Sequence, residues 1–309
     1  MVGGGRTSAG VTNEVEIIDL ETSSTICQNV EKFPTAFYGA IGGLAVDDRP
    51  LICGGNPPNN ECHYLENGNW LPFSFMNNVK LYAAVSPSPF VDGKSSLFVT
   101  GGSNGTESVG GVNATSLSEV LNERKWENSL PLPAPLFFHC TVLLNSTTVM
   151  AIGGSSETDL RPQSQNTYLL NSEHETWTEG PMLNKARLAM SCGRIRKNGQ
   201  SHQYSIIAVG GWDGSYMSTV EIFDEETGKW RFGPELPISL CCGALIEDPV
   251  GGIVLVGGEN RDDLYHDSVY RLSHAGPDAE WVKMPQKLKT GRNRHVAFLV
   301  SDDVTTCSF

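Results

Sequence analysis

Cysteine is the residue type with the widest capacity for chemistry in this chain. Cys53 and Cys62 flank a turn-forming stretch at 56–60, so in a hairpin they would lie on facing strands, close enough for a disulfide. Two free thiols in the core are the alternative. An even number of cysteines permits disulfides, but a core of this size does not require them. The eight cysteines are Cys27, Cys53, Cys62, Cys140, Cys192, Cys241, Cys242 and Cys307.

Other residue patterns argue against several kinds of ligand. The seven histidines show no metal-ligand spacing, and we expect neither a metal nor a cofactor. No helical pattern follows any of the glycine pairs, so none predicts a phosphate-binding loop. The formal net charge of −13 argues against nucleic acid as a partner, because that binding depends on clustered Lys and Arg.

The compartment stays open from sequence alone. No apolar run approaches the roughly 18 to 20 residues of a membrane helix, so we expect a soluble chain without membrane insertion. Glycosylation sequons at Asn104, Asn113 and Asn145 point outward, whereas the N-terminus lacks a secretory pattern. Both cytoplasmic and secreted locations fit, and a segment ahead of Met1 would decide between them.

The elements that position these residues repeat one sequence motif, an apolar run that ends in two glycines. The glycine pairs begin at Gly3, Gly54, Gly101, Gly153, Gly210 and Gly257, so the motif recurs every 47 to 57 residues. A period near this length is typical of propeller blades rather than of separate domains. We therefore expect a single domain over residues 1–309.

Each repeat contains four strand-like segments, most clearly in the fifth copy. The predicted strands there are 187–195, 204–209, 219–224 and 229–232. The second is apolar on both faces, which indicates a strand buried on both sides, and the third alternates. In five copies a tryptophan marks the fourth strand, where we expect it to fill the space between blades. These are Trp70, Trp126, Trp177, Trp230 and Trp281.

The two ends of the chain complement each other. The first copy lacks a first strand, and 292–300 reads as a first strand with no glycine pair after it. We expect this segment to complete the N-terminal blade, which removes free sheet edges and ties the ends together. The six repeats lie near 1–30 plus 291–300, 35–72, 80–131, 136–181, 187–235 and 240–285.

Together these features resemble the kelch repeat over nearly the whole chain. The apolar run with Gly-Gly, the alternating strand that ends near an aspartate, and the tryptophan recur in the same order. The resemblance implies an all-β fold, a six-bladed β-propeller of four-stranded antiparallel blades. The second and third repeats are degenerate in their third strands, at 64–66 and 120–122.

The resemblance also implies a binding face. In kelch propellers that bind other proteins, this face consists of the loops after the glycine pairs and the starts of the first strands. Applied to this chain, the resemblance implies a binding face rich in Lys and Arg, which we call the basic mouth. Such a face would favour an acidic peptide or a small carboxylate. Solvated rim residues without a ligand are the alternative. The candidate rim residues are Arg6, Lys80, Arg187, Trp212, Asp213, Glu259, Arg261, Arg292 and Arg294.

Related propellers with metal centres offer weaker matches. A copper radical oxidase needs a Tyr crosslinked to Cys and further Tyr and His ligands; Tyr265–His266 is an adjacent pair of the right types, but no set of partner ligands is identifiable. Kelch proteins that redirect glucosinolate breakdown bind iron through Glu-x3-Asp-x3-His. Glu259, Asp263 and His266 depart from that motif because the last gap is two residues.

We therefore expect a monomeric protein-interaction module that binds a partner protein or peptide, and no catalytic residues. The alternatives are a secreted scaffold and a carbohydrate-active enzyme of the sialic acid epimerase or mutarotase type. Such an enzyme would need an acid and a base in the channel. Glu259 with Arg187, His139 or His295 would serve, on fold analogy alone.

Overall fold

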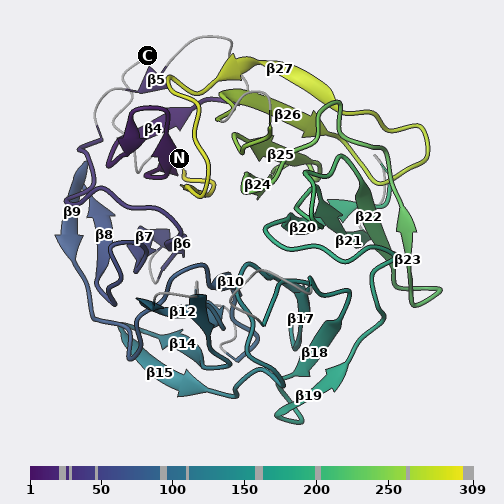
Figure 1. The fold of residues 1–309 in the computed structure, drawn as a ribbon, viewed down its shortest axis with the longest axis horizontal. Coiled ribbons are helices and arrows are strands. Elements are labelled where there is room, and N and C mark those ends of the chain that lie inside the picture. Colours follow the sequence, from purple (N-terminus) through teal and green to yellow (C-terminus); the bar gives the residue numbers. More distant parts are fainter. Residues whose placement is uncertain are drawn as a thin grey trace.

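The chain forms a ring of six blades around a central axis (Figure 1). The structure is a computed structural model that describes residues 1–20, 26–27, 30–45, 48–90, 96–108, 111–156, 163–198, 203–261 and 265–301. Each blade is a four-stranded antiparallel sheet, with its first strand nearest the axis and its fourth at the outer edge. The predicted six-bladed propeller is confirmed. Among the described residues, no helix is long and apolar enough to cross a membrane.

Five blades use consecutive segments of the chain. Blade 2 contains β6 (Ile41–Leu44), β7 (Pro50–Cys53), β8 (Cys62–Glu66) and β9 (Asn69–Pro72). Blade 3 contains β10 (Ala84–Pro87), β11 (Leu97–Thr100), β14 (Ser118–Asn122) and β15 (Lys125–Ser129). Blade 4 contains β16 (Cys140–Asn145), β17 (Thr148–Ile152), β18 (Thr167–Asn171) and β19 (Thr176–Glu179). Blade 5 contains β20 (Ser191–Arg196), β21 (Tyr204–Val209), β22 (Val220–Asp224) and β23 (Lys229–Phe232). Blade 6 contains β24 (Ala244–Glu247), β25 (Ile253–Val256), β26 (Ser268–Leu272) and β27 (Val282–Lys287).

Blade 1 joins the two ends of the chain. Its strands, from the axis outward, are β28 (Val296–Ala297), β1 (Val2–Gly3), β4 (Val15–Ile18) and β5 (Ile26–Cys27). Val2 pairs with Ala297 and Gly3 with Val296. The expected closure by a C-terminal strand is confirmed, although β28 is much shorter than the predicted strand over 292–300.

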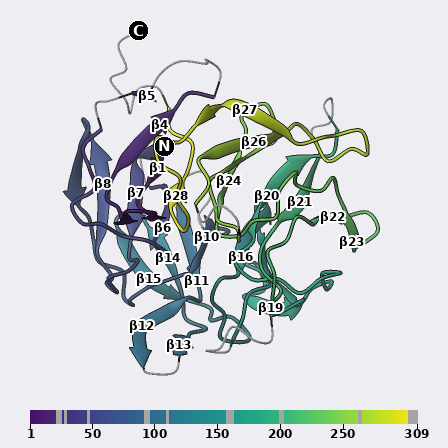
Figure 2. The same ribbon diagram turned by 45° about the horizontal axis from the view of Figure 1, so that its top comes forward.

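Two short hairpins follow glycine pairs outside the blades. They pair β2 (Arg6–Thr7) with β3 (Gly10–Val11) and β12 (Ser103–Ser108) with β13 (Gly111–Ala114). Figure 2 shows β12 extending away from the ring. Among the described residues, the loops after these two glycine pairs therefore differ from the plain four-stranded blade.

The core lies between neighbouring blades. All four residues of β25 are at most 1% exposed, as expected for a strand with apolar residues on both faces. Trp281, at the outer edge of blade 6, packs in one cluster with Ile222 of blade 5 and Leu272 of its own blade. Its indole Nε1 donates to the carbonyl oxygen of Pro234 at 3.0 Å. The predicted inter-blade position is confirmed for this tryptophan.

The glycine pairs allow the next blade to approach closely, as Gly257 and Gly258 illustrate. Their φ angles of 64° and 107° lie in the left-handed region that side chains disfavour. A Cβ on Gly257 would lie 2.7 Å from the carbonyl oxygen of Arg292. Gly258 N donates to that same oxygen at 2.9 Å. The pair therefore has the structural role that the sequence indicated.

Two disulfides join described strands. Cys53 and Cys62 lie opposite each other on β7 and β8 and are bonded, which confirms the predicted pair. A second disulfide, Cys140–Cys192, links β16 of blade 4 to β20 of blade 5. The sequence did not predict it, because cysteines 52 residues apart become neighbours only when the blades pack.

Candidate functional site

Six residues, one from each blade, form a closed ring around the axis. Each has a φ between 52° and 65°, and each donates its backbone N–H to the carbonyl oxygen of the equivalent residue in the preceding blade. The six N–O distances lie between 2.8 and 3.1 Å. We call these residues the axial ring: Gly39, Tyr82, Phe138, Ala189, Cys242 and Arg294.

The axial ring explains why the first strands begin later than predicted. Segment 187–195 reads as one strand, but Ala189 has a φ of 52° and strand β20 begins at Ser191. The same conformation at Arg294 leaves only Val296–Ala297 as strand β28. A left-handed backbone costs a residue with a side chain about 1–3 kcal/mol and is concentrated at functional sites. The ring is therefore a candidate site.

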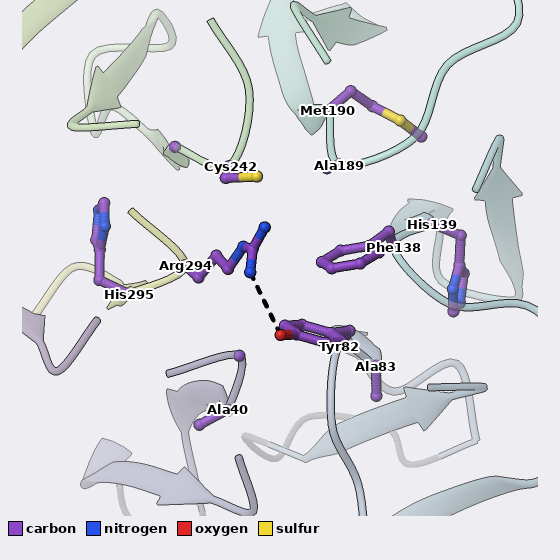
Figure 3. A pocket seen from close by; sticks show the side chains of 12 residues that line it. Ala40, Tyr82, Ala83, Phe138, His139, Ala189, Met190, Cys242, Arg294 and His295 are labelled. Atoms are coloured by element: carbon purple, nitrogen blue, oxygen red, sulfur yellow. Dashed lines mark hydrogen bonds between the residues drawn. The ribbon is translucent and has the colours of Figure 1, made fainter. Parts of the chain in front are cut away.

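A cavity of about 130 Å³ opens at this ring (Figure 3). It is lined by the six ring residues and by the residue that follows each of them. Sites for whole small molecules usually measure about 300–1,000 Å³. The cavity therefore matches one inserted side chain better than a complete substrate.

Arg294 is the one arginine or lysine among the described residues that line this cavity, whose opening we call the channel mouth. Its Cζ lies 5.5 Å from the ring centroids of both Tyr82 and Phe138, whose rings stack on each other. Figure 3 shows the guanidinium beside Cys242 and directed at Tyr82. Guanidinium groups in this position gain from the negative face of aromatic rings.

The hydrogen bonds of Arg294 are incomplete. Its Nη1 donates to Tyr82 Oη at a long 3.4 Å, and Nη2 lies 3.7 Å from Glu259 Oε1. Its Nε is buried and has no hydrogen-bond partner among the described residues. The side chain is 24% exposed, so an incoming group can reach it. Since guanidinium offers a planar fork of donors, this arrangement suits a carboxylate.

Glu259 connects Arg294 to a pair of thiols. Asn293 Nδ2 donates to Glu259 Oε2, while Glu259 Oε1 lies 3.6 Å from Cys241 Sγ and 3.8 Å from Cys242 Sγ. The two sulfur atoms are 2.9 Å apart. One ligand atom from each of Cys241, Cys242 and Glu259 lies within 4.8 Å of the others, which is compatible with a bound cation. Spacing in the sequence did not reveal this cluster.

Further aromatic residues surround the mouth. Tyr38, Trp212 and Tyr216 are half-buried, and Arg6 Cζ lies 5.2 Å above the ring of Tyr38. Burial, followed by the charge of Glu259, raises the pKa of Tyr216 to about 12, so its hydroxyl stays protonated at neutral pH. The mouth thus combines cations with aromatic side chains.

The loops after the glycine pairs lie against the starts of the first strands. Backbone bridges join Cys241 to Glu259 and Leu188 to Trp212. An equivalent bridge joins Arg6 to Asn293. The two kinds of segment that the kelch resemblance selected therefore share one face.

Three of the predicted rim cations are not on the rim. Lys80, Arg187 and Arg292 are at most 1% exposed. Arg187 donates to Gly210 O at 2.8 Å and to Glu221 Oε1 at 2.8 Å, and Arg292 pairs with Glu16 at 2.5 Å. These cations stabilise the glycine turns of their own blades, because buried carbonyl oxygens and carboxylates need donors.

Lys80 has the same structural role without a direct carboxylate bond. Its Nζ donates to Gly101 O at 3.1 Å and to Leu117 O at 2.6 Å. Burial lowers its pKa to about 8, and the charge of Glu119 opposes that shift. The expectation that Lys80, Arg187 and Arg292 belong to the basic mouth is therefore wrong, because all three are buried.

The other predicted residues remain at the surface or partly buried. Arg6, Asp213 and Arg261 are exposed, while Trp212, Glu259 and Arg294 are half-buried. Arg294 was predicted from the sequence but Tyr82, Phe138 and Cys242 were not, since in other blades the predicted positions, such as Lys80 and Arg187, lie two residues before the axial ring. The glycine at position 39, equivalent to all three, was the available signal for a left-handed residue.

The enzymatic alternatives meet specific obstacles. Arg187 is fully buried and paired with Glu221, so a substrate in the channel does not reach it. His139 and His295 are buried, and burial lowers the pKa of each to about 3. Asp263 of the iron-type motif lies outside the described residues.

Comparisons with known proteins agree with the repeat. Residues 196–237 match the family model described as "Kelch motif". The protein "Kelch repeat and BTB domain-containing protein 12" of Danio rerio is 30% identical over 159 residues, covering 47% of this chain and 25% of that protein. The chain thus spans about a quarter of the length of this relative. A solved structure described as "Structure of YjhT" has a TM-score of 0.66 and 14% identity, and the match covers 88% of this chain and 90% of the other, which supports the fold alone.

Proposed function

We propose that this chain, a kelch-repeat β-propeller, is a protein-interaction module that binds a segment of a partner protein at the channel mouth. The observation that carries the proposal is the incompletely bonded guanidinium of Arg294, which lies beside the stacked rings of Tyr82 and Phe138 at the centre of the face. An acidic side chain of the partner would complete its hydrogen bonds. Kelch proteins commonly bind protein partners, which agrees with this role.

The composition of the mouth supports a protein partner. Tyrosine, tryptophan and arginine dominate the energetics of protein interfaces, because they bury large areas and also form hydrogen bonds. Tyr38, Tyr82, Trp212 and Tyr216 provide such surfaces around Arg294. A cavity of about 130 Å³ at their centre would receive one anchoring side chain of the partner.

Local charge supports an acidic anchor. The whole chain has a formal net charge of −13, but the face around the mouth presents the exposed cations Arg6 and Arg261 together with Arg294. Exposed cations accelerate encounter with an anionic segment, and this contribution falls as salt screens it. The partly buried Arg294 would determine the stability of the complex.

A peptide library tests this proposal. The probe is a phage-displayed library of random peptides, selected against the wild-type chain, and the dissociation constants of the selected peptides are measured by calorimetry. We expect the peptides to share one Asp or Glu, and Arg294→Met to weaken their binding at least about tenfold, which is about 1.4 kcal/mol.

Arg124 provides a matched control. Its Cζ also lies over aromatic rings, 5.4 Å from Tyr64 and 5.2 Å from Phe73, but at the edge of blades 2 and 3 rather than in the cavity lining. Arg124→Met should leave the dissociation constants unchanged. Equal binding to wild type and to Arg294→Met would contradict the proposal.

A further inference from the structure

Cys241 and Cys242 form a pair of adjacent thiols at the channel mouth. Their sulfur atoms are 2.9 Å apart, closer than two unbonded sulfur atoms usually approach. Cys242 belongs to the axial ring and lines the cavity, while Cys241 is 4% exposed. One thiol is therefore reachable from solvent and the other lies directly behind it.

We propose that Cys241 and Cys242 are a redox-active dithiol that closes a disulfide between adjacent residues by exchange with a small external disulfide. The inference does not rest on the proposed partner binding, although Cys242 and Arg294 line the same cavity. Its chemistry needs a reachable attacking thiol, a second thiol within reach and a group that takes up a proton, and each is present among the described residues.

The surroundings assign different roles to the two sulfur atoms. Cys242 lines the cavity, whereas Cys241 is 4% exposed and lies behind it. An external disulfide therefore reaches Cys242 first, and the thiolate of Cys242, the nucleophilic form of the thiol, is the attacking group. The thiol of Cys241 donates toward Glu259 Oε1 at 3.6 Å, which makes this carboxylate the proton acceptor for the second step.

The reaction proceeds in two exchange steps. The Cys242 thiolate attacks one sulfur of the external disulfide, that S–S bond breaks, and one external thiolate leaves and takes up a proton. Cys241 then loses its proton to Glu259 and attacks the Cys242 sulfur, which expels the second external thiolate. The two protein thiols are oxidised, and the external disulfide is reduced to two thiols.

The product should be easy to reduce. Adjacent Cα atoms across a trans peptide are about 3.8 Å apart. Disulfides usually span about 4.4–6.8 Å between Cα atoms, and deviation from that geometry makes the bond more reducible. A bridge between Cys241 and Cys242 is therefore suited to reversible closure rather than to permanent stabilisation.

Thiol trapping tests the inference on the full chain. The protein is equilibrated in buffers with different ratios of oxidised to reduced glutathione, then unfolded in the presence of N-ethylmaleimide so that every free thiol is alkylated, and mapped by peptide mass spectrometry. In oxidising buffer we expect a Cys241–Cys242 disulfide that carries neither reagent. In reducing buffer both residues should be alkylated, while the Cys53–Cys62 peptide serves as an internal reference.

Serine variants separate the two steps. Cys241→Ser should retain glutathione on Cys242, because no second thiol displaces it, whereas Cys242→Ser should leave the buried Cys241 without glutathione. Glu259→Gln should slow closure, so glutathione accumulates transiently on Cys242, a readout that does not depend on either cysteine variant folding. Alkylation of both cysteines of the wild type in every buffer, or stable glutathione on wild-type Cys242, would overturn the inference.

Discussion

Arg292 and Arg294 stand two residues apart, yet their surroundings give them different roles. Arg292 is 1% exposed and donates to Gly4 O at 3.0 Å and to Glu16. Arg294 is 24% exposed, and its guanidinium has long contacts to Tyr82 and Glu259, lies over the Phe138 ring and contacts Cys242. A satisfied, buried cation stabilises the blade, whereas an incompletely bonded and reachable cation is available to a ligand.

The difference between these arginines marks the limit of prediction at the residue scale. The sequence showed that cations recur before the first strands, and a charged residue in such a place normally lies at the surface. Burial became clear only when the carbonyl of Gly210 and the carboxylate of Glu221 were found around Arg187. Those partners lie 23 and 34 residues from Arg187 in the sequence, so the local sequence pattern around Arg187 did not reveal them.

Acid stability tests the environment of His139. Burial, aided by the charge of Lys80, lowers the pKa of His139 to about 3, and its Nε2 lies 2.8 Å from Thr100 Oγ1. Between pH 3 and 6.5 the unfolded chain therefore binds more protons at this residue than the folded chain. Stability consequently falls as the pH drops below about 6.5, and His139 accounts for about 2 kcal/mol between pH 7 and pH 5.

Urea unfolding at pH 7 and pH 5 measures this effect. In the wild type, the free energy of unfolding should be lower at pH 5 than at pH 7. In His139→Gln this difference should be smaller by about 2 kcal/mol, because glutamine does not titrate. The exposed His174 is the control, and His174→Gln should preserve the wild-type difference. An unchanged difference in His139→Gln would show that another group causes the acid loss.

At the scale of elements, the glycine pair and the axial ring determine how one blade meets the next. The apolar runs allowed all second strands to be located, and their burial follows directly from their pattern. The start of each first strand was not predictable, since Tyr82, Phe138 and Arg294 are unusual in a left-handed conformation. Ring closure imposes that conformation through hydrogen bonds to neighbouring blades.

Two glycines with nearly the same φ angle allow the cost of a left-handed backbone to be measured separately from the cost of a steric overlap. Gly257 has a φ of 64° and Gly228 a φ of 65°, but a Cβ on Gly257 would approach Arg292 O to 2.7 Å, whereas a Cβ on Gly228 would meet nothing within 4 Å. Gly228→Ala should cost about 1 kcal/mol of unfolding free energy, from conformation alone. Gly257→Ala should cost about 3 kcal/mol or more, because the overlap adds to that cost. Equal costs in urea unfolding would refute the packing role.

At the scale of the whole molecule, the ring is closed by the chain's own ends. The blade count and the closure were predictable, because six glycine pairs and one unpaired first strand are visible in the sequence. The Cys140–Cys192 disulfide was not, because it depends on how blades 4 and 5 face each other. Closure also completes the axial ring, since Gly39 N donates to Arg294 O at 2.8 Å.

Removal of the closing segment tests that arrangement. A chain that ends at Gly291 lacks β28 and Arg294, so it exposes the edge of β1 and opens the axial ring. We expect it to lose a single cooperative thermal transition in calorimetry, and a synthetic peptide of residues 292–301 to restore that transition. A cooperative transition without the peptide would mean that closure is dispensable.

A double-mutant cycle tests the central claim most directly. The dissociation constant of a selected acidic peptide and of its Glu→Gln variant is measured against the wild-type chain and against Arg294→Met. If the peptide carboxylate pairs with Arg294, the two changes are not additive, and we predict a coupling free energy of about 1.5 kcal/mol or more. A coupling near zero would contradict the claim that Arg294 at the channel mouth is the anchor for the partner.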